Sequence, residues 1–235
     1  MNEGTLNTTI VNAFNNEFER RCISLLTNAY ASVQTARCVD IACTEEYISA
    51  VLFDYISKFA NIVEWRIDVA PEYRKYKDEI LRKKKTKKSA PQISLKYSNW
   101  MNNTNLTYLV EAQNVIEIIL PEKKKGKSRN PTIISDFHLR YIAKLDTCFS
   151  NKYPPRGCMV GYILQGETKY TVNCINHYLC NCNRHLEMLH KRPSKLKGFD
   201  ACYISVHNNH LVQHLMFDFS NNKSQEEQME DTTKK

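Results

Sequence analysis

Residues 107–119 read TYLVEAQNVIEII, and the interpretation of the whole chain starts from this stretch. It is rich in β-branched and other apolar residues, which is typical of a central strand in a sheet. Glu111 lies in the middle of its apolar half, YLVEA. Burying a charged carboxylate is costly unless the carboxylate is paired or binds a metal ion. The stretch therefore predicts a buried strand and marks Glu111 as a candidate site residue, with an ion pair to a nearby lysine as the alternative.

The sequence on both sides of this strand alternates between helical and strand patterns. Apolar residues at helical spacing predict helices over 8–30, 45–62, 133–150 and 170–190. Alternating or short apolar runs predict strands over 63–70, 91–97 and 158–164, and two more within 201–219 around a turn at Asn208-Asn209. This order predicts an α/β fold with a mixed central β-sheet flanked by helices.

The length and composition suit one fairly large domain with extensions. The chain has 235 residues, of which 42% are hydrophobic and 25% charged. We expect an N-terminal helical extension over 1–44 and an α/β domain over 45–219. The tail over 220–235 has no apolar content to bury and is predicted to be disordered.

The N-terminal residues and the apolar runs bear on where the protein works. The start, MNEGTLNTTI, has no basic segment followed by an apolar run, and the apolar runs elsewhere are far shorter than the roughly 20 residues that span a bilayer. We therefore expect a soluble, cytoplasmic protein with no membrane partner. In that compartment the nine cysteines are expected to be reduced.

The net charge of +8 is concentrated in two segments on either side of the Glu111 strand. Residues 74–88 carry a local charge of +7 and residues 122–129 a local charge of +4, so the rest of the chain sums to −3. Clustered positive charge is what a phosphate backbone attracts, although lysine runs are also common in solvated loops. The residues predicted to contact nucleic acid are Lys83, Lys84, Lys85, Lys87, Lys88, Lys123, Lys124, Lys125, Lys127 and Arg129.

The two neighbouring strands around Glu111 resemble a known nuclease motif. They read Gln92-Ile93-Ser94-Leu95 and Tyr108-Leu109-Val110-Glu111-Ala112-Gln113, and the stretches 141–153, 157–164, 205–207 and 214–219 continue the likeness. On these residues the chain resembles the PD-(D/E)xK nuclease superfamily, in a bacterial, defence-associated form, over about 45–219. The resemblance implies a restriction-endonuclease-like core, Mg²⁺ as cofactor and DNA as substrate.

The chain departs from the family pattern at two of its three motif positions. The resemblance implies an Asp on the first strand and a (D/E)-x-K triplet on the second, with Glu111 as the surviving carboxylate. Ser94 stands where the Asp is expected, and Gln113 stands where the lysine is expected. A hydroxyl is a poorer Mg²⁺ ligand than a carboxylate, and glutamine brings no positive charge. We expect Glu111, Gln113 and Ser94 to occupy the catalytic positions.

A second carboxylate is needed if Glu111 is to hold a metal ion. Asp68, on the strand predicted over 63–70, is one candidate, with a surface salt bridge as the alternative. Glu45 or Glu46 is another, because family members often place a Glu on the first core helix. Both also suit the first turn of a helix, where acids complement the helix dipole. The predicted metal set is Glu111, Asp68 and Glu46.

Cysteines and histidines cluster in the second half of the chain. On one predicted helix, Cys174 and His185 lie on a similar side whereas Cys180 points away, so four ligands from the set Cys174, His177, Cys180, Cys182 and His185 cannot converge on one ion. Zinc is therefore not expected there, although a pair such as Cys174 and His177 could contribute to a site completed elsewhere. His207, His210 and His214 are interpreted as structural or surface residues.

The sequence leaves three functions open. The first is a Mg²⁺-dependent DNA endonuclease in anti-phage defence. The second is a catalytically inactive pseudo-nuclease that binds DNA or a partner protein subunit, which Ser94 and Gln113 favour. The third is an interaction module whose lysine segments meet an acidic protein.

Overall fold

The computed structural model describes residues 8–69, 93–99, 104–117, 134–149, 157–193, 199–207 and 210–221. The N-terminal part contains the helices α1 (Thr8–Ala36), α2 (Glu45–Lys58) and α3 (Ala60–Trp65) and the strand β1 (Ile67–Val69). The strands β2 (Ile93–Asn99) and β3 (Thr104–Ile116), the helix α5 (Asp136–Cys148) and the strand β4 (Gly157–Gln165) follow. The C-terminal part contains α6 (Thr168–Asn181), the 3₁₀ turn η1 (His185–Glu187), β5 (His190–Lys191), β6 (Cys202–His207) and β7 (His210–Asp218).

The strands form one seven-stranded sheet in the order β1-β2-β3-β4-β7-β6-β5. The pairs β1-β2, β2-β3, β7-β6 and β6-β5 are antiparallel, whereas β4 runs parallel to both β3 and β7. The central strand β4 is buried, with Gly157 to Leu164 covered on both faces of the sheet. The structure thus confirms the predicted α/β fold with a mixed central sheet flanked by helices.

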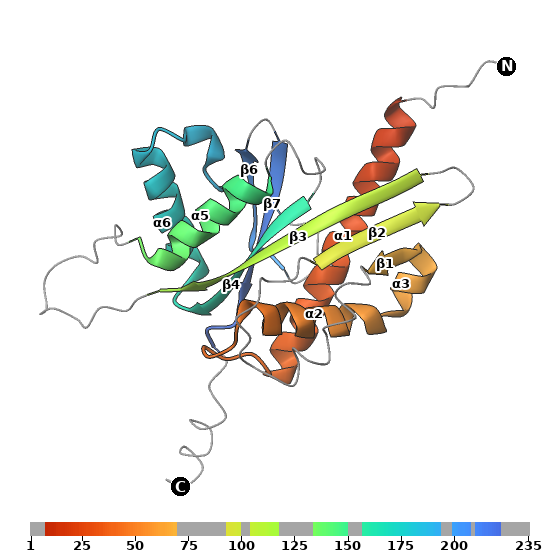
Figure 1. Cartoon of the computed structure of the whole chain (residues 1–235), viewed down its shortest axis with the longest axis horizontal. Helices are drawn as coiled ribbons and strands as arrows, with labels where there is room; N and C mark the ends of the chain where they lie inside the picture. Colours follow the sequence, from red (N-terminus) through yellow and green to blue (C-terminus); the bar gives the residue numbers. More distant parts are fainter. Residues whose placement is uncertain are drawn as a thin grey trace, which may run out of the picture.

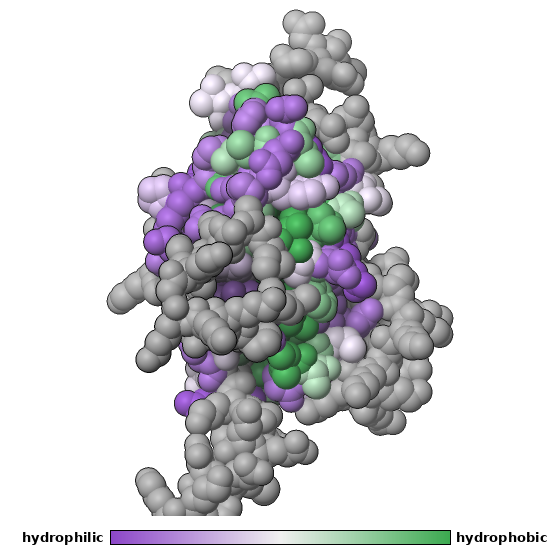
Figure 2. Space-filling model, turned by 90° about the vertical axis from the view of Figure 1, so that its left-hand side faces the viewer, coloured by the Kyte–Doolittle hydropathy of each residue, from purple (hydrophilic) through white to green (hydrophobic). Residues whose placement is uncertain are grey.

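Two hydrophobic cores lie on opposite faces of the sheet. On one face, α1 and α2 pack on residues such as Val110, Val160 and Phe217. On the other, α5 and α6 pack on residues such as Val115 and Met216. Figure 1 shows the two helical layers on either side of the strands. Hydrophilic side chains make up much of the described surface on the side where α5 and α6 lie, with apolar groups between them (Figure 2).

The helix α1 belongs to the same core as the rest of the fold. Its buried residues, from Phe18 to Val33, pack in one cluster with α2 and the sheet. The Tyr30 ring stacks on Phe217 of β7, and its hydroxyl donates to the carbonyl oxygen of Asp218 at 2.9 Å. The helix α1, predicted as part of an N-terminal extension, therefore shares a hydrophobic core with α2 and the sheet.

The prediction of one helix over 45–62 followed by a strand over 63–70 was wrong in its boundaries. The helix breaks at Phe59, whose backbone is extended, and a short helix continues to Trp65. Arg66 then adopts a left-handed conformation (φ 53°), which ends that helix. Only Ile67–Val69 pairs with β2. The alternation of residues 63–66 (VEWR) favours a strand, but in the structure these residues complete and end the helix α3.

The predicted helix over 170–190 is also shorter in the structure. α6 ends at Asn181, and Asn183 takes a left-handed conformation (φ 58°) that turns the chain into η1. Leu186 extended the apolar repeat in the sequence, yet its side chain is 78% exposed. Apolar spacing therefore predicted a helix that continues beyond Asn183, although the backbone conformation of that residue prevents it.

The other predicted elements are present within a few residues of their expected bounds. The helices begin and end at positions that differ from the prediction by up to six residues, and the two strands within 201–219 flank residues 208–209. None of the helices in the described ranges has the length and apolar character that crossing a membrane requires. The basic residues 74–88 and 122–129 and most of the predicted tail lie outside the described residues.

Two glycines of β4 differ in what surrounds them, which gives a direct test of the packing. A Cβ on Gly157 would lie 2.7 Å from the carbonyl oxygen of Leu109 and 2.9 Å from the Phe149 ring. A Cβ on Gly161 would meet mainly the flexible end of Met216, at 2.6 Å. We expect Gly157→Ala to lower the free energy of unfolding by about 1–3 kcal/mol, and by more than Gly161→Ala does. Urea unfolding of both variants measures the difference, and equal costs would contradict this packing.

Candidate functional site

The edge of β3 beyond its pairing with β2 is where the two helical layers meet. The last pair between these strands in the described ranges joins Ile93 to Val110, whereas β3 continues to Ile116. Backbone groups alternate in direction along a strand, so those of Ala112 and Asn114 point toward the β2 side. There the carbonyl oxygen of Ala112 accepts from Lys144 of α5, and the amide of Asn114 donates to Glu45 of α2.

Lys144 of α5 is the centre of this arrangement. Its Nζ donates to the carbonyl oxygen of Ala112 at 2.5 Å and to Oε1 of Glu45 at 2.5 Å. Oε2 of Glu111 lies 3.9 Å from the same nitrogen. One ammonium group is therefore surrounded by three oxygens from α2 and β3, and it ties both helical layers to the sheet edge.

Glu111 is buried, with its side chain directed to the α5 side of the sheet. It is 3% exposed, and burial raises its pKa from 4.5 to about 7, although the Lys144 charge and a hydrogen bond with Cys148 oppose this rise. Burial also raises the pKa of the Cys148 thiol to about 12, so this thiol is a hydrogen-bond donor to the carboxylate. Oε1 of Glu111 is buried and has no hydrogen-bond partner in the described part of the chain.

Glu45 occupies the first turn of α2, where a carboxylate is favoured by the helix dipole. Thr44 caps this helix by accepting from the Tyr47 amide. Oε2 of Glu45 accepts from the backbone amide of Asn114 at 3.4 Å, while its other oxygen contacts Lys144. Burial raises the pKa of Glu45, and the Lys144 charge acts against that rise. The side chain of Asn114 fixes the same corner by donating to the carbonyl oxygen of Cys43 at 3.0 Å.

The two other residues predicted at catalytic positions are near Glu111 in the fold. Gln113 lies two residues along β3, on the same face of the strand, and its Nε2 donates to the carbonyl oxygen of Asn114 at 3.3 Å. Ser94 on β2 is paired with Leu109, two residues from Glu111. The predicted adjacency of these two strands is therefore confirmed.

The structure does not bring the predicted metal residues Asp68 and Glu46 to Glu111. Asp68 lies on β1, with β2 between it and β3. It pairs with Lys96 of β2, which in turn pairs with Thr107 of β3, four residues before Glu111. Strand spacing then puts its Cα roughly 15 Å from that of Glu111. Glu45, and not its neighbour Glu46, is the residue of α2 that contacts Lys144 and Asn114. Successive helical residues point about 100° apart, so only one of them can face β3.

The predicted nucleic-acid contacts all lie outside the described residues, but the chain reaches them from this corner. The described chain resumes after the first basic segment at Ile93, which pairs with Val110 beside Glu111. It leaves toward the second basic segment after Glu117, whose amide donates to the carbonyl oxygen of Gln165. In the sequence, the first lysine-rich segment therefore precedes the part of β2 that pairs beside Glu111, and the second follows the end of β3, five residues beyond Glu111.

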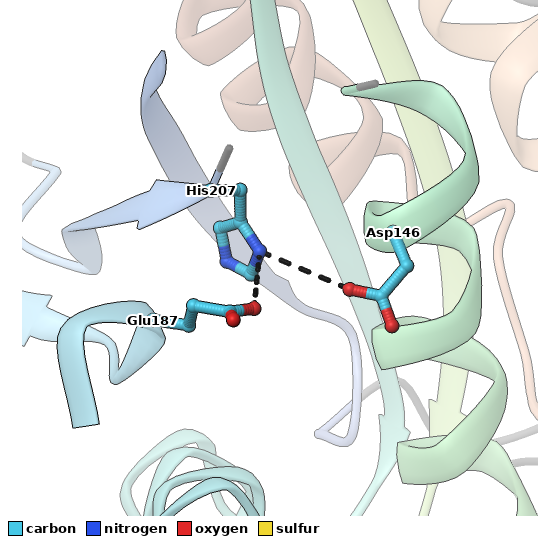
Figure 3. Close-up of side chains that lie close together, drawn as sticks. All are labelled: Asp146, Glu187 and His207. Carbon is cyan, nitrogen blue, oxygen red and sulfur yellow. Dashed lines mark ion pairs between the residues drawn. The ribbon is translucent and has the colours of Figure 1, made fainter. Parts of the chain in front are cut away.

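A second polar cluster lies across α5 from the first. Asp146 of α5, Glu187 of η1 and His207 at the end of β6 bring one ligand atom each within 4.8 Å of one another. Figure 3 shows the His207 ring with Nδ1 facing both carboxylates. Arg184 donates to the same two carboxylates, through Nη2 to Glu187 and Asp146 and through Nη1 to Asp146.

The cysteines and histidines of the predicted α6 cluster are not gathered into one place. Cys174 lies on the buried face of α6, whereas His177, Cys180 and Cys182 are exposed. His214 is a buried structural residue, as expected. It is held by the Tyr141 hydroxyl at 2.8 Å and Ser205 Oγ at 2.6 Å, and burial lowers its pKa to about 3.

The sequence did not reveal Lys144 and Cys148, which contact Glu111. It also did not reveal Asp146 and Glu187, which both face His207. One signal was present. Lys144 and Cys148 are four residues apart and flank the apolar stripe of α5, so a lysine beside that stripe was positioned to reach the sheet edge.

Comparison with known proteins gives no relative. No family model, no curated protein and no solved structure matches this chain.

The raised pKa of Glu111 predicts a pH-dependent stability. The folded protein holds this proton more tightly than the unfolded chain, so the stabilisation is complete below pH 4.5 and is lost as the pH rises through about 7. Glu111→Gln is neutral at every pH and lacks this dependence. We therefore expect the free energy of unfolding of the wild type, relative to that of Glu111→Gln, to fall by roughly 2–3 kcal/mol between pH 5 and pH 8.

Urea unfolding at several pH values measures this difference. Glu64→Gln, at an exposed position of α3, is the control and should follow the wild type. If the difference in free energy of unfolding between Glu111→Gln and the wild type stayed constant from pH 5 to pH 8, Glu111 would not titrate in this range.

Proposed function

We propose that this protein is a PD-(D/E)xK-like nucleic-acid-binding protein that hydrolyses DNA phosphodiester bonds with Mg²⁺. The observation that carries the proposal is the convergence of Glu45, Glu111 and the Ala112 carbonyl oxygen on Lys144 Nζ at the open edge of β3. A second carboxylate beside Glu111 is what the motif requires, and Glu45 supplies it from the first core helix in place of the Asp that Ser94 replaces.

The residues present fit a hard divalent cation. Carboxylate and carbonyl oxygens are the ligands Mg²⁺ prefers, and Glu45, Glu111 and Ala112 direct three of them at the point that the Lys144 ammonium occupies, so Mg²⁺ would bind there with the ammonium moved aside. Glu111 Oε1, buried without a hydrogen-bond partner in the described part, is a further oxygen available as a ligand. A Mg²⁺ ion held there would polarise a phosphodiester oxygen and lower the pKa of a water molecule.

Lys144 fits the role that Gln113 cannot perform. A lysine near the two carboxylates can offset negative charge that develops on the phosphate and orient an attacking water by hydrogen bonding. Gln113 has no charge, whereas the Lys144 ammonium lies 3.9 Å from Glu111. We therefore assign the positive charge of the site to α5.

DNA as the substrate class rests on charge. The two basic segments, with local charges of +7 and +4, precede β2 and follow β3 in the sequence, and clustered positive charge of this kind attracts a phosphate backbone. The resemblance implies a bacterial setting of defence against phage.

A specific observation also favours the second candidate, a pseudo-nuclease. The ammonium group of Lys144 neutralises the carboxylates without any metal ion, and Ser94 and Gln113 have lost the charges of the motif. A site stabilised in this way keeps its fold without catalysis. The protein would then bind DNA, or a partner subunit, through its basic segments.

Cleavage of plasmid DNA in Mg²⁺ or Mn²⁺ separates the two candidates. For the nuclease we expect Glu111→Gln, Glu45→Gln and Lys144→Met each to reduce the rate by about a hundredfold or more, because each removes a charge from the site. Lys169→Met and Glu167→Gln, at exposed positions around the start of α6, are the controls and should cut like the wild type.

The wild type's own behaviour decides between the candidates. No cleavage at any metal concentration, together with binding that weakens as salt increases, supports the pseudo-nuclease. Absence of binding even at low salt would overturn both. Cleavage that persists in Glu111→Gln would point to a contaminating nuclease.

Restoring the motif gives a second test. Ser94→Asp combined with Gln113→Lys returns a carboxylate to β2 and an ammonium to β3, the strand that carries Glu111. If the wild type is inactive, we expect this double variant to gain Mg²⁺-dependent cleavage, measured on the same plasmid. The matched control is the double variant with Glu111→Gln added, which should be inactive. A folded double variant that still does not cut would show that the scaffold, and not only its ligands, differs from a nuclease.

A further inference from the structure

The cluster formed by Asp146, Glu187 and His207 has the composition of a transition-metal site. Nδ1 of His207 lies 2.8 Å from Oε2 of Glu187 and 3.9 Å from Oδ1 of Asp146. Metal–ligand bonds of about 2.0–2.2 Å bring the ligand atoms of one zinc ion within roughly 4 Å of each other. The two separations from His207 are therefore within the range of ligands of one ion, and all three ligand atoms lie within 4.8 Å of one another.

His207 distinguishes this cluster from an ordinary group of surface acids. Its ring is 1% exposed, yet Nδ1 points at the two carboxylates (Figure 3). The other ring nitrogen, Nε2, is buried without a hydrogen-bond partner in the described ranges. The polar contacts that orient this imidazole are thus those to Asp146 and Glu187. An imidazole nitrogen among carboxylates is a ligand set for zinc and its first-row neighbours, whereas Mg²⁺ and Ca²⁺ favour oxygens alone.

Arg184 shows that this point already attracts a cation. Its Nη2 donates to Asp146 Oδ1 and Glu187 Oε2, the same two oxygens that face His207. The guanidinium is bound from the solvent side, with 26% of the side chain exposed, so it can move out without disturbing the core. The carboxylates are also partly exposed, at 43% and 25%, which leaves an entry path for an ion.

We propose that Asp146, Glu187 and His207 bind a zinc ion, which takes the place of the Arg184 guanidinium. The three ligands come from α5, η1 and β6, so the ion would fasten the helix to the C-terminal half of the sheet. The position is independent of the proposed nuclease site, which lies at the opposite edge of α5 and is made of Glu45, Glu111 and Lys144. Three protein ligands leave a fourth coordination position for water or another ligand.

Zinc titration of the whole chain tests the proposal, with affinity measured by calorimetry and stability by thermal unfolding. The background carries Cys180→Ser and Cys182→Ser, because exposed thiols are zinc ligands that could compete with the site. We expect one equivalent of zinc to bind and to raise the melting temperature. Asp146→Asn and Glu187→Gln should each weaken binding by about tenfold or more. Asp200→Asn and Glu167→Gln, at exposed positions outside the cluster, should bind like the background.

Arg184→Gln separates a zinc site from a plain ion-pair network. If zinc replaces the guanidinium, this variant binds zinc more tightly than the background and regains with zinc the melting temperature that it loses without it. If the cluster is only an ion-pair network, the variant is destabilised and zinc does not restore it, which would overturn the proposal.

Cobalt provides a spectroscopic check on the ligands. Co²⁺ in this site should give visible d–d bands without thiolate charge-transfer absorption, and both Asp146→Asn and His207→Gln should lose these bands. Far-UV circular dichroism confirms that each variant is folded, and the half-exposed carboxylate variants keep the test valid if His207→Gln does not fold. Charge-transfer bands from cysteine, or binding unchanged in the carboxylate variants, would refute the site.

Discussion

The contact between the Lys144 ammonium and the edge of β3 is the interaction on which the candidate site depends. β3 is longer than the strand it pairs with in the described ranges, so the backbone groups of Ala112 and Asn114 need partners from elsewhere. Lys144 supplies one of them from α5, and Glu45 supplies the other from α2. Because the two side chains also pair with each other, the helical layers on opposite faces are joined around this edge. Glu111 is buried next to that junction, and its raised pKa is a consequence of the burial.

Helix α5 carries two polar sites on opposite sides. Lys144 and Cys148 face Glu111, whereas Asp146, between them in the sequence, faces Arg184 and His207. Any change in the position of this helix alters both sets of contacts, since a helix moves as a unit. The apolar residues that fix it, including Tyr141 and Leu145, are fully buried in the core against β4 and β7. The rigid core therefore sets the geometry of two clusters of charge.

Much of the fold followed from local patterns, because the buried strands and the amphipathic helices carry their own periodicity. The apolar stretch around Glu111 predicted the central strand, and Ser94 was correctly placed on its neighbour. Patterns failed where a single backbone conformation decided the outcome, as at Arg66 and Asn183. They also could not supply the partner of Glu111. Lys144 is 33 residues further along the chain, and only the parallel pairing of β4 with β3 turns α5 back over the strand. The choice between Glu45 and Glu46 likewise depended on the rotation of α2 about its axis.

The part of β3 beyond Val110, which has no strand on its β2 side in the described ranges, bears on how molecules of this protein self-associate. A strand edge with free amide and carbonyl groups is a template on which a strand from a second molecule can add, and this is a common route to aggregation. Here the carbonyl oxygen of Ala112 and the amide of Asn114 are engaged by charged side chains that another strand would have to displace. The same Lys144 and Glu45 that surround the candidate site thus cover backbone groups to which a second strand would bind, so resistance to aggregation would favour keeping them whatever the site does.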